Sequence, residues 1–270
     1  MSGLLSNRSA GAIFLCYHSV APEGPRYLTV TAELFERHLR ILRDRGYVGG
    51  DLAALRALAA GEKVPPTVFL TFDDGFVDNY ETVMPLLEAY GMRAFMFVLP
   101  PLVDDAAPLI WPEVKEYQAK FPATMRSVDW EMVGKMAEGP FEIGSHTLTH
   151  PHLAARHGEE LRQELADSRR RVIERLGSCE TIAYPFGSWS REVAQAAEEV
   201  GYSFAFTLPT GVGQRGETAL SIPRVNVDYR DEERRFGFKL STAGRRVLLS
   251  RDVGTTRRAM KRLARRDGGQ

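Results

Sequence analysis

Two adjacent aspartates, Asp73 and Asp74, follow the apolar run Thr67-Val68-Phe69-Leu70 and precede Gly75. The run is typical of a buried strand that opens into a loop. Neighbouring carboxylates are costly in such a place, because burial and mutual repulsion both oppose their ionisation. A bound cation would relieve both costs, and a solvated turn would avoid them. Gly75 permits a bend that would bring both side chains to one site.

A second polar stretch holds two histidines four residues apart, His146 and His150, after the strand-like run Phe141-Glu142-Ile143. If this segment makes a helical turn, both imidazoles share one face. Together with Asp74 they would form a three-ligand site for a divalent ion, with an open position for water. The zinc-protease pattern His-Glu-x-x-His is not met, because Thr147 stands where its glutamate would be.

A third stretch, Tyr184-Pro185-Phe186-Gly187, ends another strand-like run. With Thr71-Phe72-Asp73-Asp74-Gly75 and His146-Thr147-Leu148-Thr149-His150, it resembles the motifs of the polysaccharide deacetylases of carbohydrate esterase family 4. The resemblance covers about residues 11 to 225. It implies a distorted, incomplete barrel of seven β/α units and a metal-dependent removal of N-acetyl groups. Zinc is the expected ion for such ligands, although cobalt or another first-row ion also suits them.

The resemblance also implies roles for individual residues. Asp74, His146 and His150 match the metal ligands, Asp73 matches the catalytic base, and the backbone N–H of Phe186 matches the oxyanion donor.

The general acid is harder to assign. Many members of the family use a histidine near the end of the domain, but the last histidine here is His157. In a circularly rearranged branch of the family the acid follows the first strand, and His18 in Tyr17-His18-Ser19-Val20 matches that position. We therefore expect His18 to be the acid, the alternative being a core histidine satisfied by the backbone.

The chain departs from the commoner family pattern at Ala183, where an arginine usually holds the catalytic aspartate. Either another cation holds Asp73, with Arg224 the obvious candidate, or the base is loosely held. The alternative for Arg224 is an ordinary strand-end arginine in a surface ion pair.

About seven strand-like segments alternate with helical patterns, which is typical of parallel β/α units. We expect an α/β fold in which residues 1–243 form a single domain, a distorted (β/α)7 barrel. The chemistry of such a barrel lies at the C-terminal ends of its strands. The candidate residues fall at such ends: His18, Asp73, Asp74, His146 and Tyr184. The irregular stretch 100–126 is interpreted as an insertion that lines a substrate groove.

The composition is that of an ordinary globular protein, with 270 residues, 44% hydrophobic and 26% charged. Cys16 and Cys179 are the only cysteines, and a disulfide framework is not expected. The short polar N-terminus does not resemble a secretion signal, so we expect a cytoplasmic protein.

Charge is distributed unevenly along the chain. The formal net charge is +0, yet residues 244–270 contain nine basic and two acidic residues. We expect this basic tail to be helical or disordered. It could contact an anionic membrane surface from the cytoplasmic side, or it could simply be solvated. Nucleic-acid binding is disfavoured, and the sequence does not indicate an oligomeric state.

The sequence thus predicts a metal-dependent hydrolase that acts on a carbohydrate with N-acetyl amino sugars. One alternative is an O-acetyl ester hydrolase with the same centre. A second is a degenerate sugar-binding member, suggested by Ala183 and by the missing late histidine. A third is a membrane-surface adaptor that acts through the tail.

Overall fold

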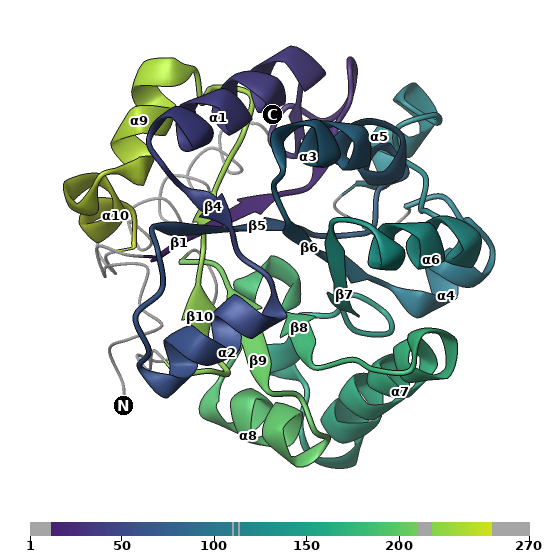
Figure 1. The fold of residues 1–270 in the computed structure, drawn as a ribbon. Coiled ribbons are helices and arrows are strands. Elements are labelled where there is room, and N and C mark those ends of the chain that lie inside the picture. The colour runs from purple at the N-terminus through teal and green to yellow at the C-terminus, as the bar shows by residue number, and fades with distance from the viewer. Residues whose placement is uncertain (1–11, 110, 113, 210–217, 250–270) are drawn as a thin grey trace, which may run out of the picture.

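The computed structural model describes residues 12–109, 111–112, 114–209 and 218–249. Within these ranges nine strands form one parallel sheet: β1 (Ala12–Tyr17), β4 (Val48–Gly49), β5 (Thr67–Phe72), β6 (Ala94–Val98), β7 (Phe141–Ser145), β8 (Thr181–Ala183), β9 (Phe204–Thr207), β10 (Ile222–Pro223) and β11 (Val225–Asn226). The strand order is β10-β9-β8-β7-β6-β5-β1-β11, with β4 beside β5. Two further short strands, β2 (Ser19–Val20) and β3 (Thr29–Val30), pair with each other. The result is a nearly closed barrel with helices around it (Figure 1).

The last barrel strand is split between two neighbours. Ile222 in β10 pairs with Phe206 in β9, whereas Val225 in β11 pairs with Leu15 in β1. Arg224 lies between these two pairings, and its backbone N–H donates to the carbonyl of Thr207. Residues 222–226 therefore serve as the seventh strand, which confirms the predicted distorted (β/α)7 barrel.

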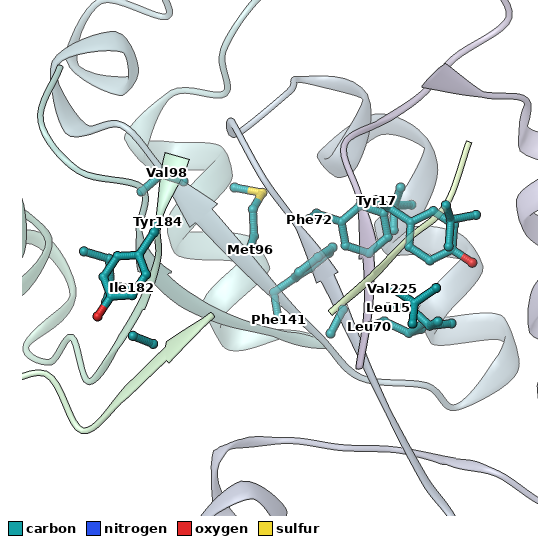
Figure 2. Close-up of a cluster of buried hydrophobic side chains, with 14 of the residues drawn as sticks. Leu15, Tyr17, Leu70, Phe72, Met96, Val98, Phe141, Ile182, Tyr184 and Val225 are labelled. Carbon is teal, nitrogen blue, oxygen red and sulfur yellow. The ribbon is translucent and has the colours of Figure 1, made fainter. Parts of the chain in front are cut away.

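Two apolar layers fill the fold because side chains alternate along each strand. One set of phenylalanines packs inside the barrel, where the rings of Phe14 and Phe69 stack 4.7 Å apart. The alternate side chains face the surrounding helices, as Figure 2 shows for Leu15, Tyr17, Leu70, Phe72 and Met96. Strands buried on both faces explain the continuous apolar runs in the sequence.

Ten α-helices of the described residues accompany the barrel: α1 (Ala32–Asp44), α2 (Leu52–Ala60), α3 (Met84–Tyr90), α4 (Pro100–Asp104), α5 (Lys115–Lys120), α6 (Trp130–Glu138), α7 (Gly158–Leu176), α8 (Arg191–Glu199), α9 (Glu233–Leu240) and α10 (Thr242–Leu248). Three short helical turns join them: the π-helix η1 (Asn79–Val83) and the 3₁₀ turns η2 (Leu153–Ala155) and η3 (Pro185–Gly187). Side chains cap several helix starts, as Thr31 does by accepting from the N–H of Leu34. None of the described helices has the length and apolar character needed to cross a membrane.

The predicted boundary between residues 243 and 244 falls inside α10. The side chain of Arg245 is buried there and donates to the carbonyl of Leu240, so the folded part of the chain continues past that boundary. Residues 250–270, which carry most of the expected basic tail, lie outside the described residues. Both cysteines, Cys16 and Cys179, are buried and unpaired with each other.

Candidate active site

The candidate residues converge because parallel strands deliver them to one end of the barrel. His18 follows β1, the two aspartates follow β5, and His146 follows β7. The backbone N–H of Asp73 donates to the carbonyl of Tyr17, which extends the pairing of β1 and β5 beyond the strands. Asp74 then adopts a left-handed conformation with φ of 74°. This bend lets neighbouring carboxylates point into one site instead of to opposite faces.

Asp74, His146 and His150 form a compact, buried triad. The Oδ1 atom of Asp74 lies 3.2 Å from Nε2 of His146 and 3.3 Å from Nε2 of His150. One ligand atom from each residue lies within 4.8 Å of the other two. The predicted metal ligands are thus brought together.

The histidines reach this position through a bent loop, so the helical turn considered from the sequence is wrong. Left-handed φ angles of 71° at Thr147 and 58° at His150 break any regular repeat. Side chains of the loop hold its own backbone. The N–H of Thr147 donates to the hydroxyl of Ser145, and the N–H of His150 donates to the hydroxyl of Thr147.

Glu164 on α7 holds the outer part of the same loop, and sequence reasoning missed it. Its Oε1 atom accepts from the backbone N–H groups of Leu148, at 2.8 Å, and Thr149, at 2.6 Å. Its Oε2 atom accepts from the hydroxyl of Thr149 at 3.0 Å. The local sequence carried no signal, because Glu164 stands among mixed charges on a long surface helix.

The donor set of the triad fits a divalent cation. His146 donates from Nδ1 to the carbonyl of Ala183 at 2.8 Å, so Nε2, which faces Asp74, is the ring nitrogen left to bind a cation or, when it carries a proton, to donate to that carboxylate. Burial disfavours the charge of Asp74, yet hydrogen bonds with His146 and His150 hold its pKa well below its usual range. A carboxylate and two imidazoles in this arrangement are ligands that zinc and similar ions accept.

Asp73 lies beside the triad and forms a two-point ion pair with Arg224. Nη1 of Arg224 donates to Oδ1 of Asp73 and Nη2 donates to Oδ2, both at 2.7 Å. Nη1 also donates to the hydroxyl of Thr71 at 2.8 Å. The two charged side chains are almost fully buried, at 0% and 3% exposure. Although burial opposes ionisation, the charge of Arg224 lowers the pKa of Asp73, so the carboxylate stays ionised.

Arg224 belongs to the seventh strand, and its buried side chain lies inside the barrel among aromatic rings. The guanidinium of Arg224 lies over the rings of Phe97 and Phe206, with centroids 5.7 Å and 5.8 Å away. Ala183 is buried in the same interior cluster. An alanine there carries no charge, and the cation that contacts Asp73 is Arg224 instead. The ion pair is therefore internal, and the alternative of a surface ion pair for Arg224 is wrong.

His18 also reaches this end of the barrel. One of its ring nitrogens lies within 4.8 Å of a carboxylate oxygen of Asp73 and of the Cys16 sulfur. Burial lowers the pKa of His18, and the charges of Asp74 and Asp73 oppose that change. Its Nδ1 atom is buried and has no hydrogen-bond partner among the described residues. His18 is thus not a core histidine satisfied by the backbone through that atom.

Aromatic side chains border the candidate metal ligands. Phe186, which has a left-handed φ of 58°, sets its ring edge-on against His150 and stacks on His152. Trp111, from the stretch expected to line a groove, stacks on the His150 ring with centroids 4.2 Å apart. Trp189, which follows the Pro185–Gly187 turn, packs in the core.

Comparison with known proteins decides the family. The family model described as polysaccharide deacetylase matches residues 60–205, more than half of the chain. The chain belongs to the polysaccharide deacetylase family. The matched segment contains the triad, Asp73 and Phe186. His18 and Arg224 lie outside it, so the structure and not the family match brings them to the site.

Relatives and solved structures agree with this placement. The chain is 29% identical to YxkH of Bacillus subtilis (strain 168), a protein named for this family, over 79% of this chain and 70% of YxkH. It is 25% identical to the poly-beta-1,6-N-acetyl-D-glucosamine N-deacetylase of Escherichia coli (strain K12), covering 86% of this chain but only 39% of that protein. The fold resembles Streptococcus pyogenes deacetylase PplD, with a TM-score of 0.71, 21% identity and coverage of 85% and 98% of the two chains.

Proposed function

We propose that this polysaccharide deacetylase is a metal-dependent hydrolase that removes N-acetyl groups from an amino-sugar glycan or glycan precursor. The observation that carries the proposal is the buried pair of Asp73 and Arg224 directly beside the triad of Asp74, His146 and His150. An ionised, oriented carboxylate beside three candidate ligands for one cation supports the proposal.

The triad would hold the ion, for which zinc is the best candidate. A bound divalent ion would supply Lewis acidity that polarises an acyl carbonyl and lowers the pKa of a water molecule. The donor set of two imidazole nitrogens and one carboxylate suits zinc or another first-row ion.

The chain's own groups would perform the proton transfers. Asp73 would accept a proton from the attacking water, because Arg224 fixes both of its oxygens and keeps it ionised. The backbone N–H of Phe186 would donate to the oxygen that becomes negative during attack. Its left-handed conformation is a local strain of the kind found at such sites.

His18 would protonate the leaving nitrogen of the amino sugar. An amine is a poor leaving group unless it receives a proton, so amide hydrolysis needs an acid at this point. An O-acetyl ester would leave more readily and depend less on His18. Ester hydrolysis by the same centre is therefore the main alternative, and the dependence on His18 distinguishes the two.

Relatives support an amino-sugar substrate. Besides the Escherichia coli N-deacetylase, the chain is 25% identical over 150 residues to a chitooligosaccharide deacetylase of Sinorhizobium fredii. Both names specify substrates built from amino sugars. We extend that substrate class, and no particular sugar or linkage, to this protein.

Two observations weigh against the alternative of a degenerate sugar-binding protein. The arginine missing at position 183 has a counterpart in Arg224, which contacts Asp73. The missing late histidine has a counterpart in His18, whose ring lies near the same carboxylate.

The deciding experiment is acetate release from short N-acetylglucosamine oligomers, with zinc or cobalt, by the wild type and by Asp73→Asn. We expect metal-dependent release by the wild type and a loss of about 10²-fold or more in the variant. Stoichiometric zinc binding by both proteins would show that the substitution leaves the metal site in place. Wild type that binds zinc and releases no acetate would refute the proposal.

A further inference from the structure

Asp78 and Asn79 are buried polar residues that the proposed reaction does not use, with 4% and 0% of their surfaces exposed. They follow the aspartate pair on the loop from β5. The Asp78 carboxylate accepts from the hydroxyl of Ser19 at 2.7 Å and from the backbone N–H of Val20 at 2.8 Å. The side-chain amide of Asn79 donates to the backbone carbonyl of His18 at 2.9 Å. Asp78 and Asn79 thus hold three consecutive residues, His18, Ser19 and Val20, by hydrogen bonds.

The side chains of Asp78 and Asn79 also contact each other. The amide nitrogen of Asn79 donates to Oδ1 of Asp78 at 2.9 Å. The same oxygen accepts from Val20, so one small network ties the loop after β5 to the segment after β1. We call Asp78 and Asn79 the clasp.

The position of His18 makes the clasp informative. His18 is a single residue between β1 and β2, and its buried Nδ1 atom has no partner among the residues that the structure describes. A catalytic imidazole is usually oriented by a hydrogen bond to the ring nitrogen that does not react. No hydrogen bond to Nδ1 orients the ring here, whereas the backbone that carries the ring is held by the clasp at the His18 carbonyl.

Two further features set the clasp apart from ordinary packing. Burial raises the pKa of Asp78 to about 6, even though three groups donate hydrogen bonds to it. Keeping a carboxyl group at this buried position therefore costs desolvation free energy. Asn79 begins the π-helical turn η1, and π-turns inside helices are frequent at functional sites.

We propose that Asp78 and Asn79 are positioning residues that set the His18 imidazole for proton donation to the leaving group, an inference that rests on the proposed function. They touch no reacting atom in this scheme. They act by fixing the backbone of His18, Ser19 and Val20 against the loop that carries Asp73 and Asp74.

The test compares an amide with an activated ester in the zinc-loaded enzyme. N-acetylglucosamine oligomers need an acid for the leaving amine, whereas 4-nitrophenyl acetate does not. We expect Asn79→Ala to lower kcat on the amide by about tenfold or more with little change in KM, and to change ester hydrolysis less than about threefold. Asp78→Asn should keep most amide activity, because its amide oxygen can still accept from Val20 and its NH₂ group can donate to Ser19.

A double-mutant cycle separates positioning from a general loss of structure. In the His18→Ala background the Asn79→Ala change should cost no further amide activity, because the group it orients is gone. His38→Gln is the control for losing a buried hydrogen-bonding group, and it should affect amide and ester alike. Equal losses on both substrates for Asn79→Ala, or additive losses in the double variant, would overturn the proposal.

Failure of the proposed function would look different. In that case the zinc-loaded wild type would release no acetate from the amide. The clasp is then judged by crystal structures of the wild type and of Asn79→Ala. A displaced or disordered His18 ring in the variant supports the positioning role, and an unchanged ring excludes it.

Discussion

Arg224 and Asp73 form a two-point ion pair across the end of the barrel, with both N···O distances at 2.7 Å. The arginine comes from the point where the seventh strand changes partner between β9 and β1. A buried arginine that meets a carboxylate with two parallel hydrogen bonds fixes its orientation as well as its charge. Barrel closure and the orientation of the candidate base are thus achieved by the same five-residue segment.

Replacing Arg224 should damage both activity and stability. Arg224→Lys keeps a positive charge but cannot form two parallel hydrogen bonds, so we expect kcat to fall by about 10²-fold. Arg224→Met leaves the Asp73 carboxylate buried without its cationic partner, and should lower the free energy of unfolding by about 3–5 kcal/mol. Steady-state kinetics and urea denaturation measure the two effects.

The double variant Arg224→Met with Asp73→Asn provides the control. Removing the stranded charge should restore part of the lost stability while leaving the protein inactive. If Arg224→Met alone kept wild-type turnover, the ion pair would have no role in holding the base.

Glu164 should control how tightly the triad binds metal. Glu164→Ala removes the acceptor for two backbone N–H groups in the histidine loop, so the loop must bind zinc without that support. Loss of such outer support typically weakens metal affinity by about 10–100-fold. Competition with a zinc-binding dye gives the dissociation constant.

Two variants on the same helix calibrate the Glu164 result. Glu164→Gln retains an acceptor oxygen, and its zinc affinity should lie between those of the wild type and Glu164→Ala. Glu174→Ala removes an exposed carboxylate that pairs with Arg170, and its zinc affinity should match the wild type. Equal affinity in Glu164→Ala and Glu174→Ala would contradict the role of Glu164.

The sequence predicted the barrel and its main residues because their signals are local. Apolar runs ending in Asp73, His146 or Tyr184 mark strand ends, and parallel strands bring such ends together. Helix caps are equally local, as Thr31 shows by accepting from the N–H of Leu34 three positions on.

Features that depend on distant residues were less accessible. The pairing of Arg224 with Asp73 spans 151 positions, and from the sequence it could be offered only as one of two alternatives. The histidine loop was considered as a helical turn because its left-handed residues, Thr147 and His150, are not glycines. Glu164 and the clasp carry no motif, because their hydrogen bonds appear only once the loops are folded.

His18 should affect the acid step without affecting the metal. It is absent from the triad of ligand atoms, so His18→Ala should bind one zinc ion with wild-type affinity. Amide hydrolysis should fall by about 10²–10⁴-fold, because the leaving amine loses its proton donor. Acetate release and zinc titration on the same preparation test both statements. Loss of zinc together with activity would instead identify His18 as a ligand.

His38 should make the protein sensitive to mild acid. Burial lowers its pKa to about 4, while Nε2 donates to the carbonyl of Asp231 and the hydroxyl of Tyr17 lies 3.1 Å from Nδ1. Since an unfolded histidine has a pKa near 6.5, the unfolded chain binds more protons below that value. The stabilisation is therefore complete above about pH 6.5 and is lost as the pH falls toward about 4, by about 3 kcal/mol.

Urea denaturation of the wild type and His38→Gln between about pH 4.5 and 7.5 isolates this contribution, since the other titrating groups are common to both proteins. Burial raises the pKa of Asp78 to about 6, which gives a slope of opposite sign over part of the range, so only the difference between the two proteins is diagnostic. Glutamine is not protonated in this range, so the free energy of unfolding of His38→Gln relative to the wild type should increase as the pH falls. Parallel stability curves would show that His38 does not titrate between these limits.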